Sequence, residues 1–116
     1  MRFVILEHDH PFLHWDFMLE SVDRLQTWRL VRPPETIGDV IEATALGDHR
    51  IAYLTYEGPV SGNRGIVRRW DAGTFAECDD SSATCRRLVL TGLRVKGTVE
   101  LLRVDGGRWT FRIVRA

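Results

Sequence analysis

Short apolar or alternating runs, separated by turn residues, recur along the whole chain. Runs of this length and composition are typical of β-strands. The clearest alternation lies in residues 12–20, FLHWDFMLE, where Trp15 and Phe17 fall on one face and His14 and Asp16 on the other. The pattern predicts eight or nine strands, at residues 2–7, 12–20, 25–31, 50–58, 66–71, 74–78, 86–92, 97–104 and 108–114.

The remaining segments are turns, or are ambiguous. Residues 36–46, TIGDVIEATAL, leave a short helical turn open as an alternative, whereas VDGGRW at 104–109 indicates a tight hairpin. So many strands with little helix favour an antiparallel barrel or sandwich, because either architecture removes strand edges. We therefore predict a single all-β domain over residues 1–116.

Composition narrows the function classes. Sixteen basic and sixteen acidic side chains cancel, which argues against a protein that coats nucleic acid by bulk charge alone. No apolar run is long enough for a membrane span and no signal peptide is evident, so we expect a cytoplasmic protein that has no contact with membranes. In such a compartment Cys78 and Cys85 are expected to be two free thiols.

The stretch EHDHPFLHWDFMLE, residues 7–20, concentrates histidines and aspartates. His14 and Asp16 point the same way on a strand, and the preceding turn places His8 opposite His14. Two imidazoles and one carboxylate suit Mn²⁺, Fe²⁺ or Zn²⁺. The alternative is that these residues are only the polar face of a half-exposed strand, and spacing alone leaves both interpretations open. His10, in the turn, is expected to be solvated.

A second histidine lies in GDHRIAYLTYEG, residues 47–58. His49 and Tyr53 are four residues apart and share a face. Histidine can serve as a general acid or phosphate donor, and tyrosine as a hydrogen-bond donor. The alternative is a surface histidine and a tyrosine at the edge of the core.

These stretches, taken with others in order, resemble the 3′-phosphoesterase domain of bacterial DNA ligase D. The family's opening motif F-V-(I/V)-x-x-H-x5-L-H-Y-D-F-R-L-E resembles FVILEHDHPFLHWDFMLE here. Its S-W-A-V-P-K-G-P resembles TWRLVRPP at 27–34, its D-H-P-L-x-Y-x-x-F-E-G resembles DHRIAYLTYEG at 48–58, and its W-D-x-G-T-(W/Y) resembles WDAGTF at 70–75. The resemblance covers nearly the whole chain.

The resemblance implies a small antiparallel β-barrel of about eight strands, in a stand-alone and divergent member. It implies a manganese-dependent hydrolase of DNA repair, which removes a 3′-terminal ribonucleoside and then the 3′-phosphate. His8, His14 and Asp16 match the family's metal ligands, and His49 and Tyr53 match its other active-site pair. Mn²⁺ is the expected cofactor, with another divalent transition metal as the alternative. The expected partners are DNA or RNA-tipped DNA 3′ ends or a phosphorylated small molecule, together with an end-joining ligase or polymerase.

Two departures bear on activity. Met18 stands where the family motif has the arginine of D-F-R-L-E, and a second family arginine falls near Ile41. One interpretation is that another arginine binds the phosphate, the candidates being Arg32, Arg50 and Arg64. A second is a changed substrate, including one that is not nucleic acid. A third is a binding module for nucleic-acid ends or a partner protein that has lost catalysis.

Overall fold

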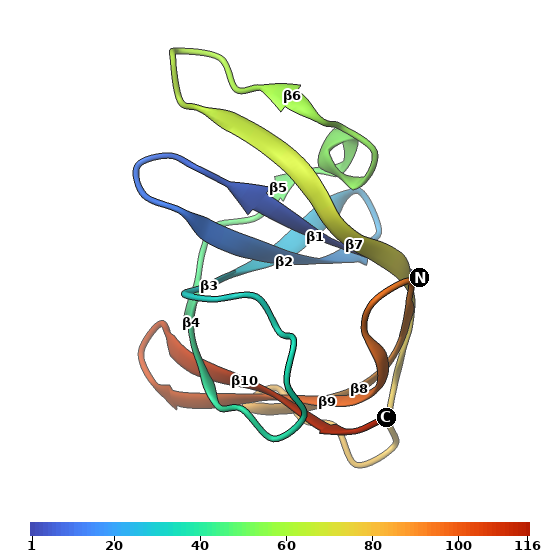
Figure 1. Ribbon diagram of the computed structural model, residues 1–116. Helices are drawn as coiled ribbons and strands as arrows, with labels where there is room; N and C mark the ends of the chain where they lie inside the picture. The colour runs from blue at the N-terminus through green and yellow to red at the C-terminus, as the bar shows by residue number, and fades with distance from the viewer.

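The strands of the barrel wall pair with antiparallel neighbours in an unbroken ring. They are β1 (Arg2–His8), β2 (His14–Ser21), β3 (Arg24–Leu30), β4 (Ile41–Ala45), β7 (Ile66–Glu77), β8 (Cys85–Gly92), β9 (Lys96–Asp105) and β10 (Arg108–Arg115). In the computed structural model, which describes residues 1–116, the order is β1-β2-β3-β4-β10-β9-β8-β7, and β7 pairs with β1 to close the ring (Figure 1). The prediction of a small all-β barrel of about eight strands is confirmed.

A small second layer covers part of the outside of this wall. It contains β5 (His49–Arg50), the 3-10 turn η1 (Ile51–Leu54) and β6 (Gly58–Pro59). β5 pairs with β3 and β6 pairs with β7, so the layer lies over the outer face of β1 and β2 (Figure 1). The four-residue turn η1 is the only helical segment, and no helix is long and apolar enough to cross a bilayer.

Two apolar clusters result, one on each side of the β1–β2 hairpin. The barrel interior holds 16 buried residues, among them Phe17 and Phe111, whose ring centroids lie 5.2 Å apart edge to face. The outer cluster lies between the wall and the covering layer and consists of Val4, Leu6, Met18, Leu25, Leu54, Val60 and Val67. Strands β1 and β2 are therefore buried on both faces, which allows the outer face to hold a desolvated site.

Three predicted elements differ from the structure. The strand expected over residues 50–58 is wrong, because residues 51–54 form η1 and bury Leu54 in the outer cluster rather than pairing along a sheet. The segment 36–46 ends in a strand, β4, and not in a helical turn, because β3 and β10 both pair with it. The strands expected at 66–71 and 74–78 are one strand, β7.

Gly73 explains the continuity of β7, since the sequence suggested a break there. A Cβ atom at position 73 would lie 2.0 Å from the carbonyl oxygen of Thr91 on β8. The glycine therefore permits close approach of two strands rather than a turn. The hairpin predicted at VDGGRW is confirmed, with Asp105 paired to Arg108. Both cysteines are free, as predicted.

Asp71, in the WDAGTF motif, has a structural task. Its carboxylate is 2% exposed and accepts hydrogen bonds from the backbone N–H groups of Leu93 and Val95, both at 2.8 Å. It also accepts from the N–H groups of Ala72 and Arg94. One buried carboxylate thus satisfies the backbone of the turn between β8 and β9 and ties that turn to β7.

We predict that Asp71→Asn lowers the free energy of unfolding by about 2 kcal/mol. The amide replaces one acceptor oxygen by an NH₂ group, which then faces backbone N–H donors that have lost their acceptor. Urea denaturation measures the change. Asp79→Asn is the control, since Asp79 is exposed on the loop between β7 and β8. A loss no greater than that of the control would contradict the role assigned to Asp71.

Candidate metal centre

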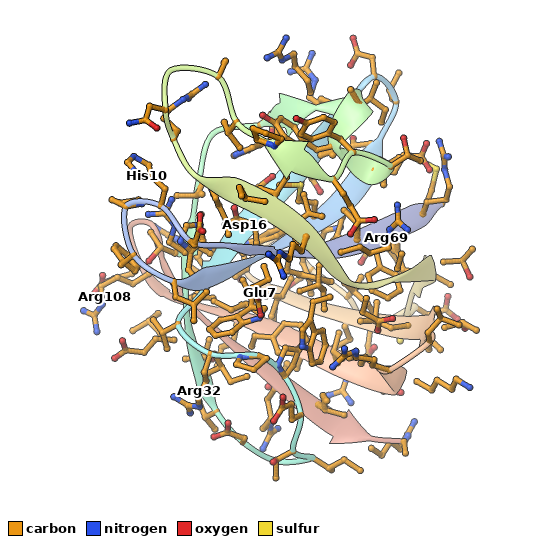
Figure 2. All side chains as sticks on the ribbon, turned by 45° about the horizontal axis from the view of Figure 1, so that its top comes forward. Glu7, His10, Asp16, Arg32, Arg69 and Arg108 are labelled. Atoms are coloured by element: carbon orange, nitrogen blue, oxygen red, sulfur yellow. The ribbon has the colours of Figure 1, made fainter.

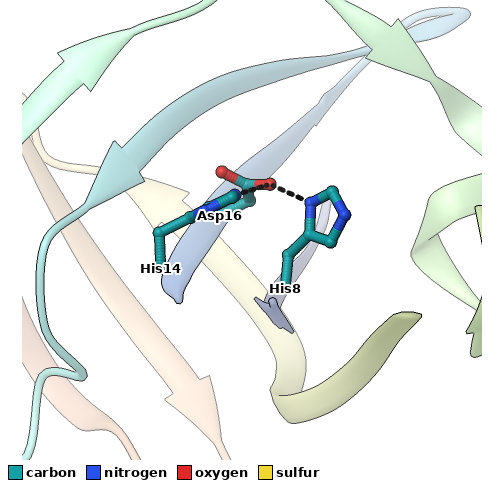
Figure 3. Close-up of side chains that lie close together, drawn as sticks. All are labelled: His8, His14 and Asp16. Atoms are coloured by element: carbon teal, nitrogen blue, oxygen red, sulfur yellow. Dashed lines mark hydrogen bonds and ion pairs between the residues drawn. The ribbon is translucent and has the colours of Figure 1, made fainter. Parts of the chain in front are cut away.

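The register of the first hairpin brings three candidate ligands together. His8 on β1 pairs directly with His14 on β2, and Asp16 lies two residues further along β2 on the same face. Asp16 Oδ2 lies 3.2 Å from His14 Nε2 and 3.9 Å from His8 Nδ1 (Figure 3). The three ligand atoms all lie within 4.8 Å of one another. The structure therefore brings the three sequence-predicted ligands into one cluster.

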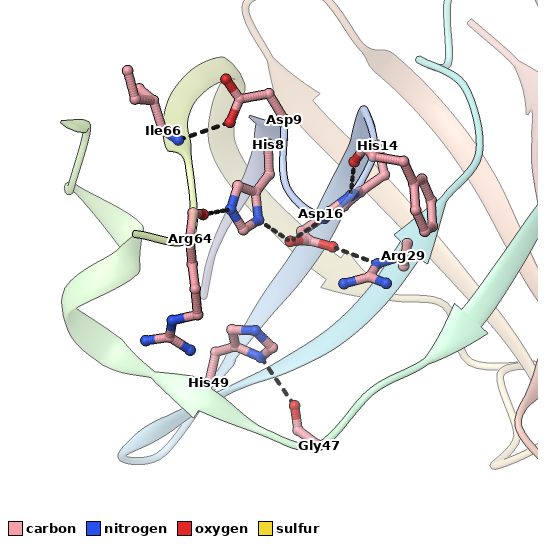
Figure 4. Close-up of polar contacts among 10 residues, drawn as sticks. His8, Asp9, His14, Asp16, Arg29, Gly47, His49, Arg64 and Ile66 are labelled. Atoms are coloured by element: carbon pink, nitrogen blue, oxygen red, sulfur yellow. Dashed lines mark hydrogen bonds and ion pairs between the residues drawn. The ribbon is translucent and has the colours of Figure 1, made fainter. Parts of the chain in front are cut away.

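Each imidazole directs its other nitrogen to a backbone carbonyl. His8 Nε2 lies 2.8 Å from the carbonyl oxygen of Arg64, and His14 Nδ1 lies 2.8 Å from that of Phe12 (Figure 4). A carbonyl oxygen only accepts, so these outer nitrogens carry the N–H groups and donate. In the neutral rings the nitrogens that face Asp16 are then unprotonated. Orientation of this kind is what metal-binding histidines receive from their surroundings.

The burial of the cluster separates the two interpretations left open by the spacing. His14 is 0% exposed and Asp16 is 3% exposed, so they are not the polar face of a half-exposed strand. Asp16 Oδ2 faces the two histidines, whereas Oδ1 faces Arg29 at 3.9 Å and has no hydrogen-bond partner, although it is buried. A buried carboxylate is costly unless a charge or donors compensate for it. The residues therefore fit a divalent cation, which three unprotonated donors would share.

A pocket of about 260 Å³ opens beside the cluster. His8, Asp16 and His49 contribute polar groups to it, while Leu6 and Met18 are among its apolar lining residues. The polar groups of the cluster and of His49 therefore face one opening that a substrate could enter.

His49 and Tyr53 lie together at this pocket, as their spacing predicted. Their ring centroids lie 6.0 Å apart, edge to face. His49 Nδ1 donates to the carbonyl oxygen of Gly47 at 3.0 Å, which leaves Nε2 as the nitrogen available to the pocket (Figure 4). This arrangement suits proton transfer through Nε2.

The three candidate phosphate-binding arginines have different places. Arg50 and Arg64 line the pocket. Arg32 does not: its guanidinium makes two hydrogen bonds to Asp39, at 2.7 and 2.8 Å, and it lies well away from Asp16 (Figure 2). The same contact lowers the pKa of the Asp39 carboxyl below its usual value. Arg32 is thus engaged elsewhere on the surface.

The two positions at which the chain lacks a family arginine, 18 and 41, lie on different faces of the barrel wall. Met18 lines the pocket, 1% exposed, and lies in the outer cluster. Ile41 is 1% exposed and packs inside the barrel, so its side chain does not line the pocket. Of these two positions, only 18 contributes to the pocket.

Sequence reasoning missed Arg29 and Asp48. Asp48 lines the pocket next to His49. Arg29 lies directly across from Asp16 in the β2–β3 register, with its Nε 3.9 Å from Asp16 Oδ1 (Figure 4). A signal for Arg29 was present, because the motif that TWRLVRPP resembles has alanine at this position.

A contact between two loops holds the carbonyl of Arg64 against His8. Asp9 Oδ1 accepts from the backbone N–H of Ile66 at 2.8 Å, and this bond lowers the pKa of Asp9. Gly65, with a φ of +76°, makes the approach feasible, since a Cβ atom there would lie 2.2 Å from Asp9 Oδ1. The sequence carries no signal for this contact.

Comparison with known proteins identifies the family. The model of the DNA ligase D 3′-phosphoesterase domain matches residues 6–103, which include every candidate site residue. The chain belongs to this family. The resemblance predicted from the motifs is confirmed at the level of the family.

Three relatives illustrate the similarity. The multifunctional non-homologous end joining protein LigD of Mycobacterium bovis is 35% identical over 117 residues, which cover 92% of this chain and 15% of that protein. The LigD proteins of Mycolicibacterium smegmatis and Pseudomonas aeruginosa are 28% and 26% identical, over 93% and 90% of this chain. The chain spans between 14% and 16% of the length of these relatives.

We predict that Gly65→Ala is more damaging than Gly38→Ala. Both glycines have positive φ, but a Cβ at position 38 meets nothing within 4 Å. Gly38→Ala should cost about 1 kcal/mol of unfolding free energy for the left-handed backbone. Gly65→Ala should cost about 2 kcal/mol more, because Asp9 must move. Urea denaturation measures both, and Mn²⁺ affinity should fall in the Gly65 variant alone; equal effects would argue against the loop contact.

Proposed function

We propose that this chain is a divalent-metal-dependent phosphoesterase that acts on the 3′ ends of DNA. One observation carries the proposal: a ring nitrogen of His8 and one of His14 face the same oxygen of Asp16. His8 and Asp16 line a pocket that His49 also lines. Membership of the 3′-phosphoesterase family supports the reaction class. The proposed reactions are removal of a 3′-terminal ribonucleoside and of a 3′-phosphate.

The proposed cofactor is Mn²⁺, with another divalent transition metal as the alternative. Two imidazole nitrogens and one carboxylate oxygen are a donor set that such ions accept while leaving positions for substrate. When bound, the cation would supply Lewis acidity toward a phosphoryl oxygen. His8, His14 and Asp16 would hold it, and the carbonyls of Arg64 and Phe12 keep both rings in position.

The other pocket residues would address the phosphate itself. His49, in its protonated form, would donate from Nε2 to the leaving oxygen, while Nδ1 stays bonded to Gly47. Tyr53 would donate a hydrogen bond from its hydroxyl group. Arg50 and Arg64 supply positive charge at the same pocket.

The proposed substrate class is a DNA 3′ end, with or without a terminal ribonucleotide. The relatives are named for non-homologous end joining, which processes DNA ends. We extend this role to the present chain and propose an end-joining ligase or polymerase as its partner. The balanced net charge indicates that binding depends on the local pocket rather than on the whole surface.

A second candidate function is a binding module of the same fold without hydrolysis. Met18 favours it, since an apolar side chain lines the pocket where the family motif has an arginine. Such a module would bind 3′-phosphate DNA and yield no product. Turnover therefore separates the two functions.

We predict that His14→Ala lowers the affinity for Mn²⁺ at least about 100-fold, because a ligand nitrogen is lost. Isothermal calorimetry of the apoprotein measures the affinity. His10→Ala is the matched control, since His10 is an exposed histidine of the adjoining turn. No detectable Mn²⁺ uptake by the unaltered chain would refute the metal centre.

We predict that His49→Ala lowers kcat by about 10²- to 10⁴-fold, the usual contribution of a general acid, and leaves Mn²⁺ affinity unchanged. The assay uses a primer-template ending in a ribonucleotide or a 3′-phosphate, with Mn²⁺ and then with EDTA. Phosphate binding without any product from the unaltered chain would support the binding module instead.

A further inference from the structure

Arg29 is a charged residue that lies next to the proposed metal ligand Asp16 on the neighbouring strand. In the register of β1, β2 and β3, Leu6 pairs with Asp16 and Asp16 pairs with Arg29. Side chains directly opposite on one face of an antiparallel pair have Cβ atoms about 4.5–5.5 Å apart. Arg29 therefore lies beside Asp16 on the outer face of the wall (Figure 4). It belongs to β3, whereas His8 belongs to β1 on the other side of β2.

The guanidinium of Arg29 is incompletely satisfied. Its Nε is buried and has no hydrogen-bond partner, and the facing Asp16 Oδ1 has none either. The two atoms are 3.9 Å apart, which permits ionic attraction but is too long for a hydrogen bond. By contrast, Arg32 and Arg86 each use their guanidinium nitrogens in hydrogen bonds with side chains. Because Nε is buried and the side chain is 27% exposed, the terminal nitrogens of Arg29 are the donors that a ligand could reach.

A cation–π contact flanks this guanidinium. It lies over the ring of Phe12, with its central carbon 5.4 Å from the ring centroid. The carbonyl of the same residue accepts from His14. Phe12 thus orients a proposed metal ligand and a cation together, and the side chain of Arg29 is only 27% exposed. A partly desolvated and oriented arginine is well suited to a forked contact with phosphate.

The positive charges around Asp16 would favour binding of an anion. With a divalent cation bound, one carboxylate would be surrounded by that cation and by Arg29, so positive charge would exceed negative charge. Arg50 and Arg64 add to the excess at the pocket, and the carboxylate of Asp48 offsets only part of it. A phosphate group is the anion that the proposed function supplies.

We propose that Arg29 binds a non-bridging oxygen of the substrate phosphate and takes the place of the arginine that is absent at Met18. Met18 pairs with Thr27, so positions 18 and 29 are diagonal neighbours that both adjoin Asp16. An arginine at either position approaches the same carboxylate from a different direction. This inference rests on the proposed function and names a residue for its phosphate-binding step.

The experiment measures phosphate recognition without turnover. In Mn²⁺-loaded protein carrying His49→Ala, fluorescence anisotropy compares an oligonucleotide ending in a 3′-phosphate with the same oligonucleotide ending in a 3′-hydroxyl. We expect this His49→Ala protein, the parent for the variants below, to bind the 3′-phosphate oligonucleotide with at least about tenfold higher affinity. Adding Arg29→Ala should bring the ratio close to one, and adding Arg29→Lys should give an intermediate ratio. Urea denaturation checks that each variant is folded.

A matched control and a second readout exclude a merely structural role. Arg108→Ala removes the same charge from an exposed position on β10, and should leave the ratio unchanged. Calorimetry should find the Mn²⁺ affinity of Arg29→Ala undiminished, because Arg29 is not a ligand. A retained preference in Arg29→Ala, a parent without preference, or a parallel loss of Mn²⁺ affinity would each overturn the proposal. If 3′-phosphate recognition depends on Arg29 but the unaltered chain shows no turnover, the proposed hydrolysis is refuted and the role of Arg29 stands.

Discussion

The pairing of His8 with His14 across the β1–β2 hairpin is the constraint on which the candidate site depends. The register is fixed by the opposite face of the same two strands, where Phe3, Ile5 and Phe17 pack inside the barrel. A shift by one residue would exchange the faces of β2 and place His14 and Asp16 in the apolar interior. The hydrophobic core therefore positions the polar donors, although it does not touch their ligand atoms.

Desolvation of the site comes from the second layer rather than from the barrel. Leu54 and Val60 pack on the outer cluster, and the loop that ends at Ile66 is tied back to Asp9. This layer also supplies His49 to the pocket, and its connecting loop supplies the carbonyl of Arg64 that orients His8. The same layer therefore covers the hairpin and completes the site. A change in this layer is expected to alter both the burial and the orientation of the ligands.

The sequence predicted what depends on local pattern and left out what depends on distant neighbours. Alternation placed His14 and Asp16 on one face, and the turn placed His8 opposite them, because strand geometry alone decides both. The covering segment was assigned wrongly as a strand, because Tyr53 and Leu54 have the composition of a strand and are held in η1 by packing on the outer cluster. Pattern also cannot show that a carbonyl such as that of Phe12 accepts from His14, since any residue could supply it.

Arg29 and Ile41 show a further limit of reading motifs along the chain. Ile41 stands where a family arginine was expected, yet its side chain belongs to the barrel interior. Arg29 differs from the alanine of the family motif, but the motif does not show what this arginine faces. Only the β2–β3 register shows that it lies opposite Asp16. A motif gives the order of residues along a strand, whereas the charge around a ligand depends on the neighbouring strand.

The double burial of β2 favours an apolar residue at position 18 of this chain. Met18 is 1% exposed and completes the outer cluster with Leu25 and Leu54, where an arginine would need its own anion to offset desolvation. Position 29 is less enclosed, so an arginine there keeps partial access to water. An arginine on β3 thus provides positive charge at this carboxylate without burying a cation in the outer cluster. The interior of the barrel is unaffected, because positions 18 and 29 both lie on the outer face of the wall.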